Sequence, residues 1–178
     1  MNSEKIKSII ESLLFISIKP LSVKQIKNKL PEVQTTVIQK ALNELYNDYQ
    51  KRKGGFYLAE VSNGYQFRTP TENKEWIKKT TSETTRAMSK ATLETLTIIA
   101  YKQPLMRSDI EHIRGVDAGG PIKNLLNMKL IKVFGRKNIP GRPLIYATTS
   151  YFLEFFNLKS IEDLPDLNDI EALDKPNR

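Results

Sequence analysis

The chain has 178 residues, of which 39% are hydrophobic, so it is long enough to bury one core or two small ones. It contains no cysteine, which excludes disulfides, thiolate metal ligands and a cysteine nucleophile. The net charge of +8 permits contact with nucleic acid or another anionic surface without identifying either. No apolar run approaches the roughly 20 residues of a membrane-spanning helix, and the first residues lack the plan of a signal peptide. We therefore expect a globular, cytoplasmic protein that has no contact with a membrane.

The beginning of the chain predicts three helices in succession. Apolar residues at helical spacing indicate an amphipathic helix over 3–18, which ends before Pro20. Ser22 begins a short second helix, and Gln25 three residues later completes a capping box. A third helix is expected from about 36 to 52, with its apolar residues on one face.

A β-hairpin follows the third helix. Two short strands are predicted over 56–62 and 65–69, joined by Asn63-Gly64. We expect these two residues to supply the positive φ angles of a type I′ turn. Three helices and a hairpin within residues 1–70 are typical of a winged helix, a variant of the helix-turn-helix.

The next segment, 71–88, is predicted to be a linker. It contains a short helix around Trp76 and then a polar, turn-prone stretch over 80–85.

The same order of elements returns about 84 residues later. Ser89 begins a helix that runs to Tyr101, and Pro104-Leu105 then corresponds to Pro20-Leu21. A loop of Gly, Pro and basic residues over 135–143 lies at the position of the hairpin tip. The chain therefore repeats one structural plan.

The second copy is predicted to span 89–166. It ends with an apolar helix over 151–156 and one more helical turn at 161–165, and the acidic tail 167–178 is expected to be disordered. The predicted fold class is α+β, mainly α, with two tandem winged-helix domains.

The sequence offers no constellation of catalytic groups. His112 is the sole imidazole, and its position in a predicted helix indicates an ordinary surface or half-buried residue. Gly119-Gly120-Pro121 lacks the Lys-Ser or Lys-Thr pair of a phosphate-binding loop and instead predicts the start of a helix. We expect no catalytic residue, no metal site, no cofactor and no enzymatic activity.

Positive charge is concentrated in the second half of the chain. No acidic residue occurs between Asp117 and Glu154, whereas six basic residues do: Lys123, Lys129, Lys132, Arg136, Lys137 and Arg142. These cations are either solvated or in contact with phosphates. The third helix of the first domain argues against base reading, because Glu44 and Asp48 on its polar face would repel phosphates. A DNA-binding regulator stays the alternative function, and any DNA contact is expected to be indirect or weak.

The first helix has more apolar surface than one core requires. With Phe15 and Ile18 included, apolar residues cover more than half of its circumference, wider than the stripe of about 100° that a surface helix needs. Either the hairpin and linker cover this surface, or a partner or a second copy of the chain does. The expected dimer interface consists of Ile6, Ile9, Leu13, Phe15 and Ile16.

Several segments together resemble the segregation and condensation protein B family. They occur in order at 89–104, 110–116, 135–137, 140–143 and 146–149. The resemblance covers about 85–165, and residues 11–15 and 19–22 fit the N-terminal part of the family more loosely.

This resemblance implies a non-enzymatic homodimer that acts in chromosome condensation and partition during cell division. Members bind the kleisin, segregation and condensation protein A, and through it the SMC ATPase, so a nucleoid-associated location is expected. The family's dimerisation is attributed largely to the N-terminal domain and its kleisin binding prominently to the C-terminal one. The partner-binding residues expected here are Tyr101, Gln103, Arg114, Arg136, Arg142 and Tyr146.

The sequence departs from the family pattern at several positions, among them Gly119-Gly120, which loosens the entry to the following helix. Met106 stands where members usually have a threonine that could cap the following helix, which predicts that the cap moves to Ser108, with Glu111 three residues on. Ala147 and Asn157 replace common glycines.

Overall fold

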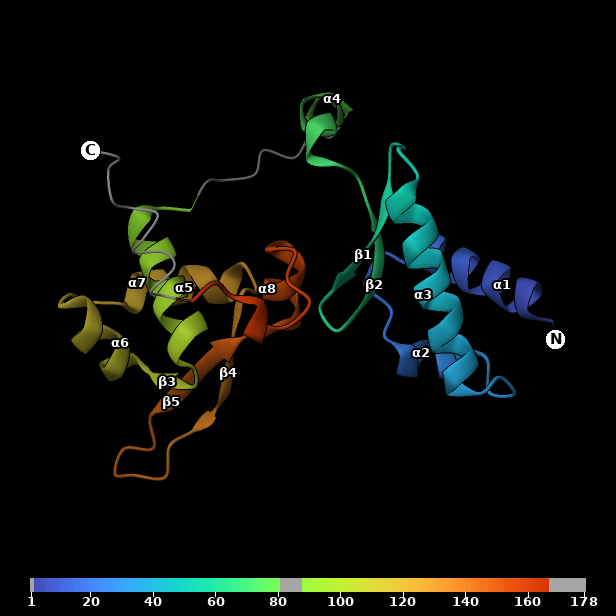
Figure 1. Cartoon of the computed structure of the whole chain (residues 1–178). Helices are drawn as coiled ribbons and strands as arrows, with labels where there is room; N and C mark the ends of the chain where they lie inside the picture. Colours follow the sequence, from blue (N-terminus) through green and yellow to red (C-terminus); the bar gives the residue numbers. More distant parts are fainter. Residues whose placement is uncertain (1, 81–87, 167–178) are drawn as a thin grey trace. The chain divides into compact units, whose positions relative to one another are not determined.

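A computed structural model describes residues 2–80 and 88–166 of the chain (Figure 1). The chain divides into two compact units, residues 1–85 and 86–178. Both are winged helices, so the predicted α+β class with a majority of helix is confirmed. The polar stretch that continues to residue 85 and the tail from 167, for which turns and disorder were predicted, lie outside the described residues.

The first unit follows the predicted order of helices and strands. Its elements are α1 (Ser3–Ile16), α2 (Val23–Lys29), α3 (Thr35–Lys51), β1 (Tyr57–Val61), β2 (Gly64–Arg68), the 3-10 helix η1 (Thr71–Asn73) and α4 (Lys74–Thr80). The first helix ends two residues earlier than predicted, and the third is shifted by one residue.

Local capping explains where the helices of this unit begin. The predicted capping box is confirmed: the Ser22 N–H donates to Gln25 Oε1 at 2.8 Å, and the Gln25 N–H donates to Ser22 Oγ at 3.3 Å. The α1 helix is capped in the same way by Asn2, whose side chain accepts from the Lys5 N–H at 2.9 Å.

The hairpin is present, but its turn differs from the prediction. The positive φ angles fall on Ser62 (52°) and Asn63 (56°), whereas Gly64 begins β2 and pairs with Val61. The reason lies in Leu21, whose backbone exchanges hydrogen bonds with Tyr65 at 2.9 and 3.0 Å. A Cβ at position 64 would lie 2.8 Å from the carbonyl carbon of Leu21, so a close backbone approach requires this glycine.

The second unit repeats the plan and extends it. Its elements are α5 (Lys90–Lys102), β3 (Leu105–Met106), α6 (Arg107–Arg114), α7 (Gly119–Asn127), β4 (Ile131–Arg136), β5 (Leu144–Thr148), α8 (Ser150–Phe155) and the 3-10 helix η2 (Ile161–Asp163). The three strands form an antiparallel sheet in the order β3-β5-β4, in which β4 is an edge (Figure 1).

The two units share a specific backbone pairing. Leu105 pairs with Tyr146 in the second unit as Leu21 pairs with Tyr65 in the first. Each pairing attaches the segment after the first helix to the last strand of the hairpin. The repeat that the sequence predicted is therefore present in the backbone.

The predicted cap at Ser108 is wrong. The α6 helix begins at Arg107, directly after β3, because Met106 is held in the sheet opposite Ile145. Met106 has no side chain that could cap the helix. Instead the Asp109 carboxylate accepts the Met106 N–H at 2.9 Å, which satisfies the first free donor of the helix.

Each unit has its own core. In the first, α1 and α3 pack against the hairpin through Ile10, Leu14, Leu42 and Leu58. In the second, the largest fully buried side chains are Leu96, Ile99, Ile110, Leu125 and Leu130. In the described ranges no helix combines the length and the apolar character needed to cross a membrane.

Candidate interaction surfaces

The C-terminal end of α1 leaves large apolar side chains in solvent. Phe15 is 74% exposed, Ile16 73% and Ile18 89%. We call these three residues the apolar end of α1. Isolated exposed apolar residues are ordinary, but three large ones within four positions form a patch of the kind found at interfaces.

The other residues of the predicted dimer interface lie deeper. Ile6 is a core residue with 5% exposure, and Ile9 and Leu13 are half-buried against the same core. They face the core because α1 packs against α3 along positions four residues apart, Ile6, Ile10 and Leu14. The free surface of the predicted interface is therefore its last part, Phe15 and Ile16.

The acidic side chains of α3 are partly neutralised by α1. Lys7 Nζ donates to Asp48 Oδ2 at 2.6 Å and lies 4.0 Å from Glu44 Oε2. The hydrogen bond to Asp48 raises the pKa of Lys7. The sequence had indicated two carboxylates that repel phosphates, and this pairing weakens that argument.

Three of the predicted partner-binding residues form contacts within the second unit. Gln103 Oε1 accepts from the Thr148 N–H at 2.6 Å and from the Thr148 hydroxyl at 2.9 Å, which attaches α5 to β5. The Tyr101 hydroxyl donates to the Pro165 carbonyl at 2.7 Å. Tyr146 is buried in the core. These three residues therefore stabilise the second unit. At most part of this surface is accessible to a partner.

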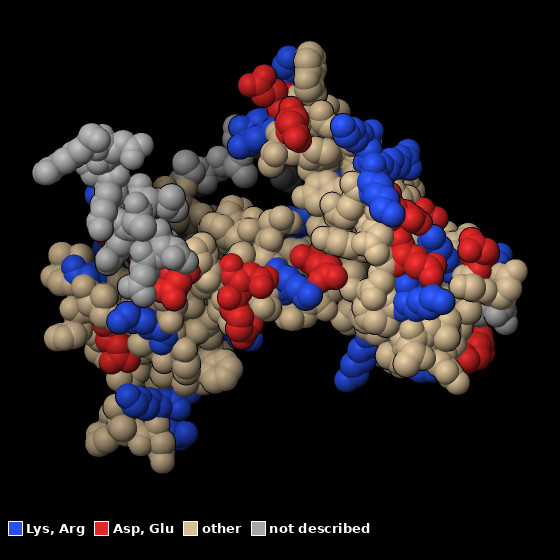
Figure 2. Space-filling view, in the orientation of Figure 1, with Lys and Arg blue, Asp and Glu red and all other residues tan. Residues whose placement is uncertain are grey.

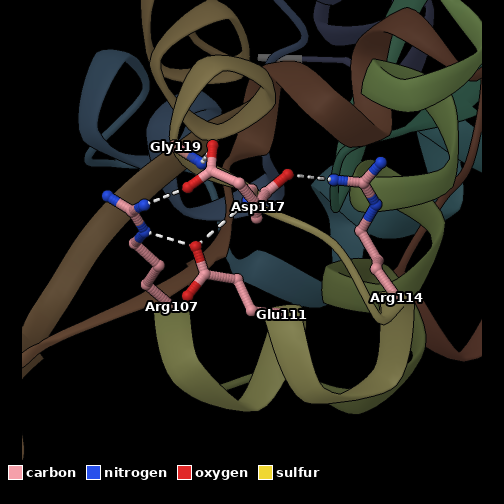
Figure 3. Close-up of polar contacts among 6 residues, drawn as sticks. Arg107, Glu111, Arg114, Asp117 and Gly119 are labelled. Atoms are coloured by element: carbon pink, nitrogen blue, oxygen red, sulfur yellow. Dashed lines mark hydrogen bonds and ion pairs between the residues drawn. The ribbon is translucent and has the colours of Figure 1, made fainter.

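Arg114 is also an internal residue. Its side chain is 6% exposed, and its Nη1 donates to the Asp117 carbonyl at 2.8 Å (Figure 3). Its Nη2 lies 3.6 Å from Glu94 Oε2. It thereby connects α5, α6 and the turn before α7. Its Nε has no hydrogen-bond partner among the described residues.

A charged corner joins α6 to α7 beside Arg114 (Figure 3). Arg107 Nε donates to Glu111 Oε1 at 2.6 Å, and its Nη2 pairs with Asp117. Glu111 also accepts the Ala118 N–H at 3.1 Å, and Asp117 accepts the Gly119 N–H at 3.0 Å. The hydrogen bond from Arg107 is the main cause that lowers the pKa of Glu111, and Glu111 in turn raises the pKa of Arg107.

Sequence analysis did not assign this corner. Its one local signal was the spacing of Arg107 and Glu111, four residues apart on one helix. The contacts to Asp117 and Ala118 depend on the chain reversal after α6, where Gly115 ends the helix with a φ of 73°.

The loop at 135–143, which we call the basic tip, forms an ordered turn. The Arg142 N–H donates to the Ile139 carbonyl at 2.9 Å, and Pro140 and Gly141 lie between them, with a φ of 82° at Gly141. Proline followed by a glycine of positive φ is typical of a type II turn. Below the turn, the Lys137 N–H donates to the Pro143 carbonyl at 2.9 Å. The prediction that this loop lies at the tip of a hairpin is confirmed.

The α8 helix exposes three aromatic rings that sequence analysis did not assign to a site. Tyr151, Phe155 and Phe156 are exposed, and their rings touch, with centroids 6.2 Å apart for Tyr151 and Phe155 and 5.1 Å for Phe155 and Phe156. The signal was the nearly uniform apolar character of 151–156, which exceeds what one buried face requires. We call these three residues the aromatic face of α8.

Comparison with known proteins places the chain in a family. Residues 8–167 match the model of the segregation and condensation complex subunit ScpB. The chain belongs to this family. It is 42% identical to segregation and condensation protein B of Syntrophotalea carbinolica, over 98% of this chain and 88% of that protein. It is 45% identical to the protein of the same name from Clostridium acetobutylicum, over 93% of this chain and 82% of that protein.

One similar solved structure carries the description of a dimer of the ScpB N-terminal domain complexed with a ScpA peptide. It has a TM-score of 0.39 and 29% identity, and the match covers 44% of this chain and 96% of that chain.

For this ScpB-family chain, the structure separates the six expected partner-binding residues into two groups. Tyr101, Gln103, Arg114 and Tyr146 form contacts within the second unit. Arg136 and Arg142 lie exposed on the basic tip. The described residues contain no group of three metal-ligating side chains, and His112 is exposed on α6.

Proposed function

We propose that the protein is a non-enzymatic accessory subunit of an SMC–kleisin complex that acts in chromosome condensation and partition. In this role it forms a homodimer and binds and stabilises the kleisin, segregation and condensation protein A. Family membership over residues 8–167 supports the assignment to such a complex. Residues 1–70 carry dimerisation, 71–88 form a linker and 89–166 bind the partner.

The apolar end of α1 is the observation that carries this proposal. Phe15, Ile16 and Ile18 are each more than 70% exposed, although the core of the first unit is complete without them. Burying large apolar side chains stabilises an association by about 25 cal/mol per Å² of apolar surface, before the entropic cost of association. A second copy of the same surface, related by a two-fold axis, would cover it.

The aromatic face of α8 is the surface proposed for the kleisin. Tyr and Phe are both enriched in the buried centre of protein interfaces relative to the rest of the protein surface. Tyr151 and Phe155 on α8 and Phe156 at its C-cap offer three such rings in the second unit, outside the residues proposed to form the dimer.

Light scattering coupled to size-exclusion chromatography tests the dimer. The natural chain is expected to elute with twice the mass of one chain, and the double variant Phe15→Glu, Ile16→Glu with the mass of one. The reason is that two buried carboxylates without partners would oppose association strongly. Both positions are exposed in the single chain, so the substitutions are expected to leave its fold intact.

Trp76→Glu is the matched control, because Trp76 on α4 is an exposed large apolar side chain of the same unit that lies outside the proposed interface. This variant is expected to stay dimeric. In the same samples, the natural chain is expected to retain the cognate kleisin in a pull-down assay. A monomeric natural chain that also fails to retain the kleisin would overturn the proposal.

A further inference from the structure

Six basic residues of the second unit have no acidic partner among the residues that the structure describes. None of them forms an ion pair with another described residue, whereas Lys7, Arg107 and Arg114 elsewhere in the chain do. The six are Lys123, Lys129, Lys132, Arg136, Lys137 and Arg142. All six are exposed. Their charge is available to an external anion.

Four of these cations share one hairpin. Lys132 and Arg136 lie on β4, and Lys137 and Arg142 lie in the basic tip. Lys132 and Arg136 pair with Ala147 and Leu144 of β5, both uncharged, so the sheet places no carboxylate opposite them. The segment 118–153 contains no acidic residue at all.

The tip has an ordered backbone and fixes one of its cations. Arg136 Nη1 donates to the Arg142 carbonyl at 3.0 Å, which fixes one guanidinium across the turn and leaves its other N–H groups free to donate. The type II turn and the Lys137–Pro143 hydrogen bond constrain the backbone on both sides. Less side-chain and backbone entropy is therefore lost on binding than in a flexible loop.

The shape of the hairpin suits contact with a large polyanion. Figure 2 shows the β4–β5 hairpin as a prong that projects from its unit, with blue atoms and no red ones on the visible side of the tip. On the first unit in the same view, blue and red atoms are intermixed. A convex basic prong can contact the regularly spaced phosphates along a duplex.

We propose that the β4–β5 hairpin of the second unit is a contact site for duplex DNA that binds phosphates without reading sequence. Arg136, Lys137 and Arg142 supply the contacts at the tip. Lysine and arginine contacts to phosphate position a protein on DNA and carry no direct sequence information. Arg136 and Arg142, which the sequence predicted to bind the partner, are thus assigned to DNA, while the residues proposed for the dimer and for the kleisin lie at the end of α1 and on the aromatic face of α8.

Fluorescence anisotropy with the full chain and a labelled duplex of arbitrary sequence tests the site. The triple variant Arg136→Gln, Lys137→Gln, Arg142→Gln is expected to bind about tenfold or more weakly at roughly 50 mM salt. The slope of log K against log salt is expected to become shallower by about 2 to 3, since each lost phosphate contact removes about 0.9. Glutamine keeps a donor for the Arg142 carbonyl, and thermal unfolding measured by circular dichroism checks that the variant is folded.

The matched control removes three positive charges elsewhere. Lys24, Lys29 and Lys40 are exposed in the first unit and form no ion pair with a described residue, so the variant Lys24→Gln, Lys29→Gln, Lys40→Gln has the same net charge as the tip variant. It is expected to keep most of the affinity and the salt slope. Restoring Arg136 by Lys in the tip variant is expected to recover part of the affinity.

Two results would overturn the inference. Equal losses in the tip and control variants would mean that net charge alone attracts the DNA. The inference also fails if the tip variant binds DNA as tightly as the natural chain but loses affinity for a labelled peptide of residues 160–178, since the tip would then bind acidic peptide and not DNA.

Discussion

Only glycine fits at position 64, because a backbone segment distant in the sequence lies close to it. A Cβ there would lie 2.8 Å from the carbonyl carbon and 2.9 Å from the carbonyl oxygen of Leu21. Neither atom can move without breaking the Leu21–Tyr65 pairing. Gly64→Ala is therefore expected to destabilise the first unit by about 1–3 kcal/mol, measured by native-state hydrogen exchange of the β1 and β2 amides.

Gly55→Ala is the control for this substitution. Gly55 lies just before the same hairpin, and nothing stands within 4 Å of a Cβ at that position. Its effect is expected to stay within about 0.5 kcal/mol. If both variants lower hydrogen-exchange protection equally, the loss of stability comes from replacing a glycine as such and not from the close approach of Leu21.

The limits of sequence reasoning are clearest for single side chains. The pair Asn63-Gly64 correctly predicted a hairpin, but the positions of its positive φ angles depend on Leu21, more than 40 residues away in the chain. Gln103 and Arg114 were likewise expected to bind a partner, but both make contacts within the second unit. Their partners, Thr148 and the Asp117 carbonyl, are set by tertiary packing, which no local pattern encodes.

At the scale of elements, patterns of apolar residues and caps predicted most helices within one or two residues. Ser22 and Ser89 both begin helices as expected, because a side-chain cap is a local interaction. The cap of α6 was misplaced because β3, only two residues long, holds Met106 in the sheet. A strand this short leaves no periodic signal in the sequence.

The corner between α6 and α7 predicts a dependence of stability on pH. The hydrogen bond from Arg107 lowers the pKa of Glu111 below its ordinary value of 4.5 in the folded chain. The carboxylate therefore stabilises the fold above that value, and this contribution is lost as the pH falls through the lowered pKa. Glu111→Gln is expected to be less stable than the natural chain near pH 7, and the difference is expected to disappear in acid.

Urea denaturation followed by circular dichroism, at several values between about pH 3 and pH 7, measures this effect. Glu32→Gln is the control, since Glu32 is exposed and forms no ion pair with a described residue. Its pH profile is expected to parallel that of the natural chain. A Glu111→Gln profile that also runs parallel would show that the corner does not favour the charged carboxylate.

At the scale of the whole molecule, one structural plan occurs twice, and each copy exposes a different kind of side chain. The first unit leaves apolar side chains exposed at the end of α1, and the second leaves exposed aromatic rings on α8 and exposed cations on its hairpin. The repeated pairing of Leu21 with Tyr65 and of Leu105 with Tyr146 preserves the plan, while the exposed residues around it differ. Each surface can therefore be altered without touching the other two.

The aromatic face of α8 provides the last test of this separation. Phe155→Asp introduces a charge where the kleisin is proposed to dock, and it is expected to weaken kleisin binding by about 2 kcal/mol or more, the loss typical of a residue that dominates an interface. Leu93→Asp is the matched control, because Leu93 on α5 is an exposed apolar side chain of the same unit outside that face. Isothermal titration calorimetry with the cognate kleisin measures both variants, and light scattering is expected to find both dimeric. Equal loss of affinity in the two variants would place the kleisin elsewhere on the second unit, whereas loss of the dimer in Phe155→Asp would show that α8 takes part in self-association.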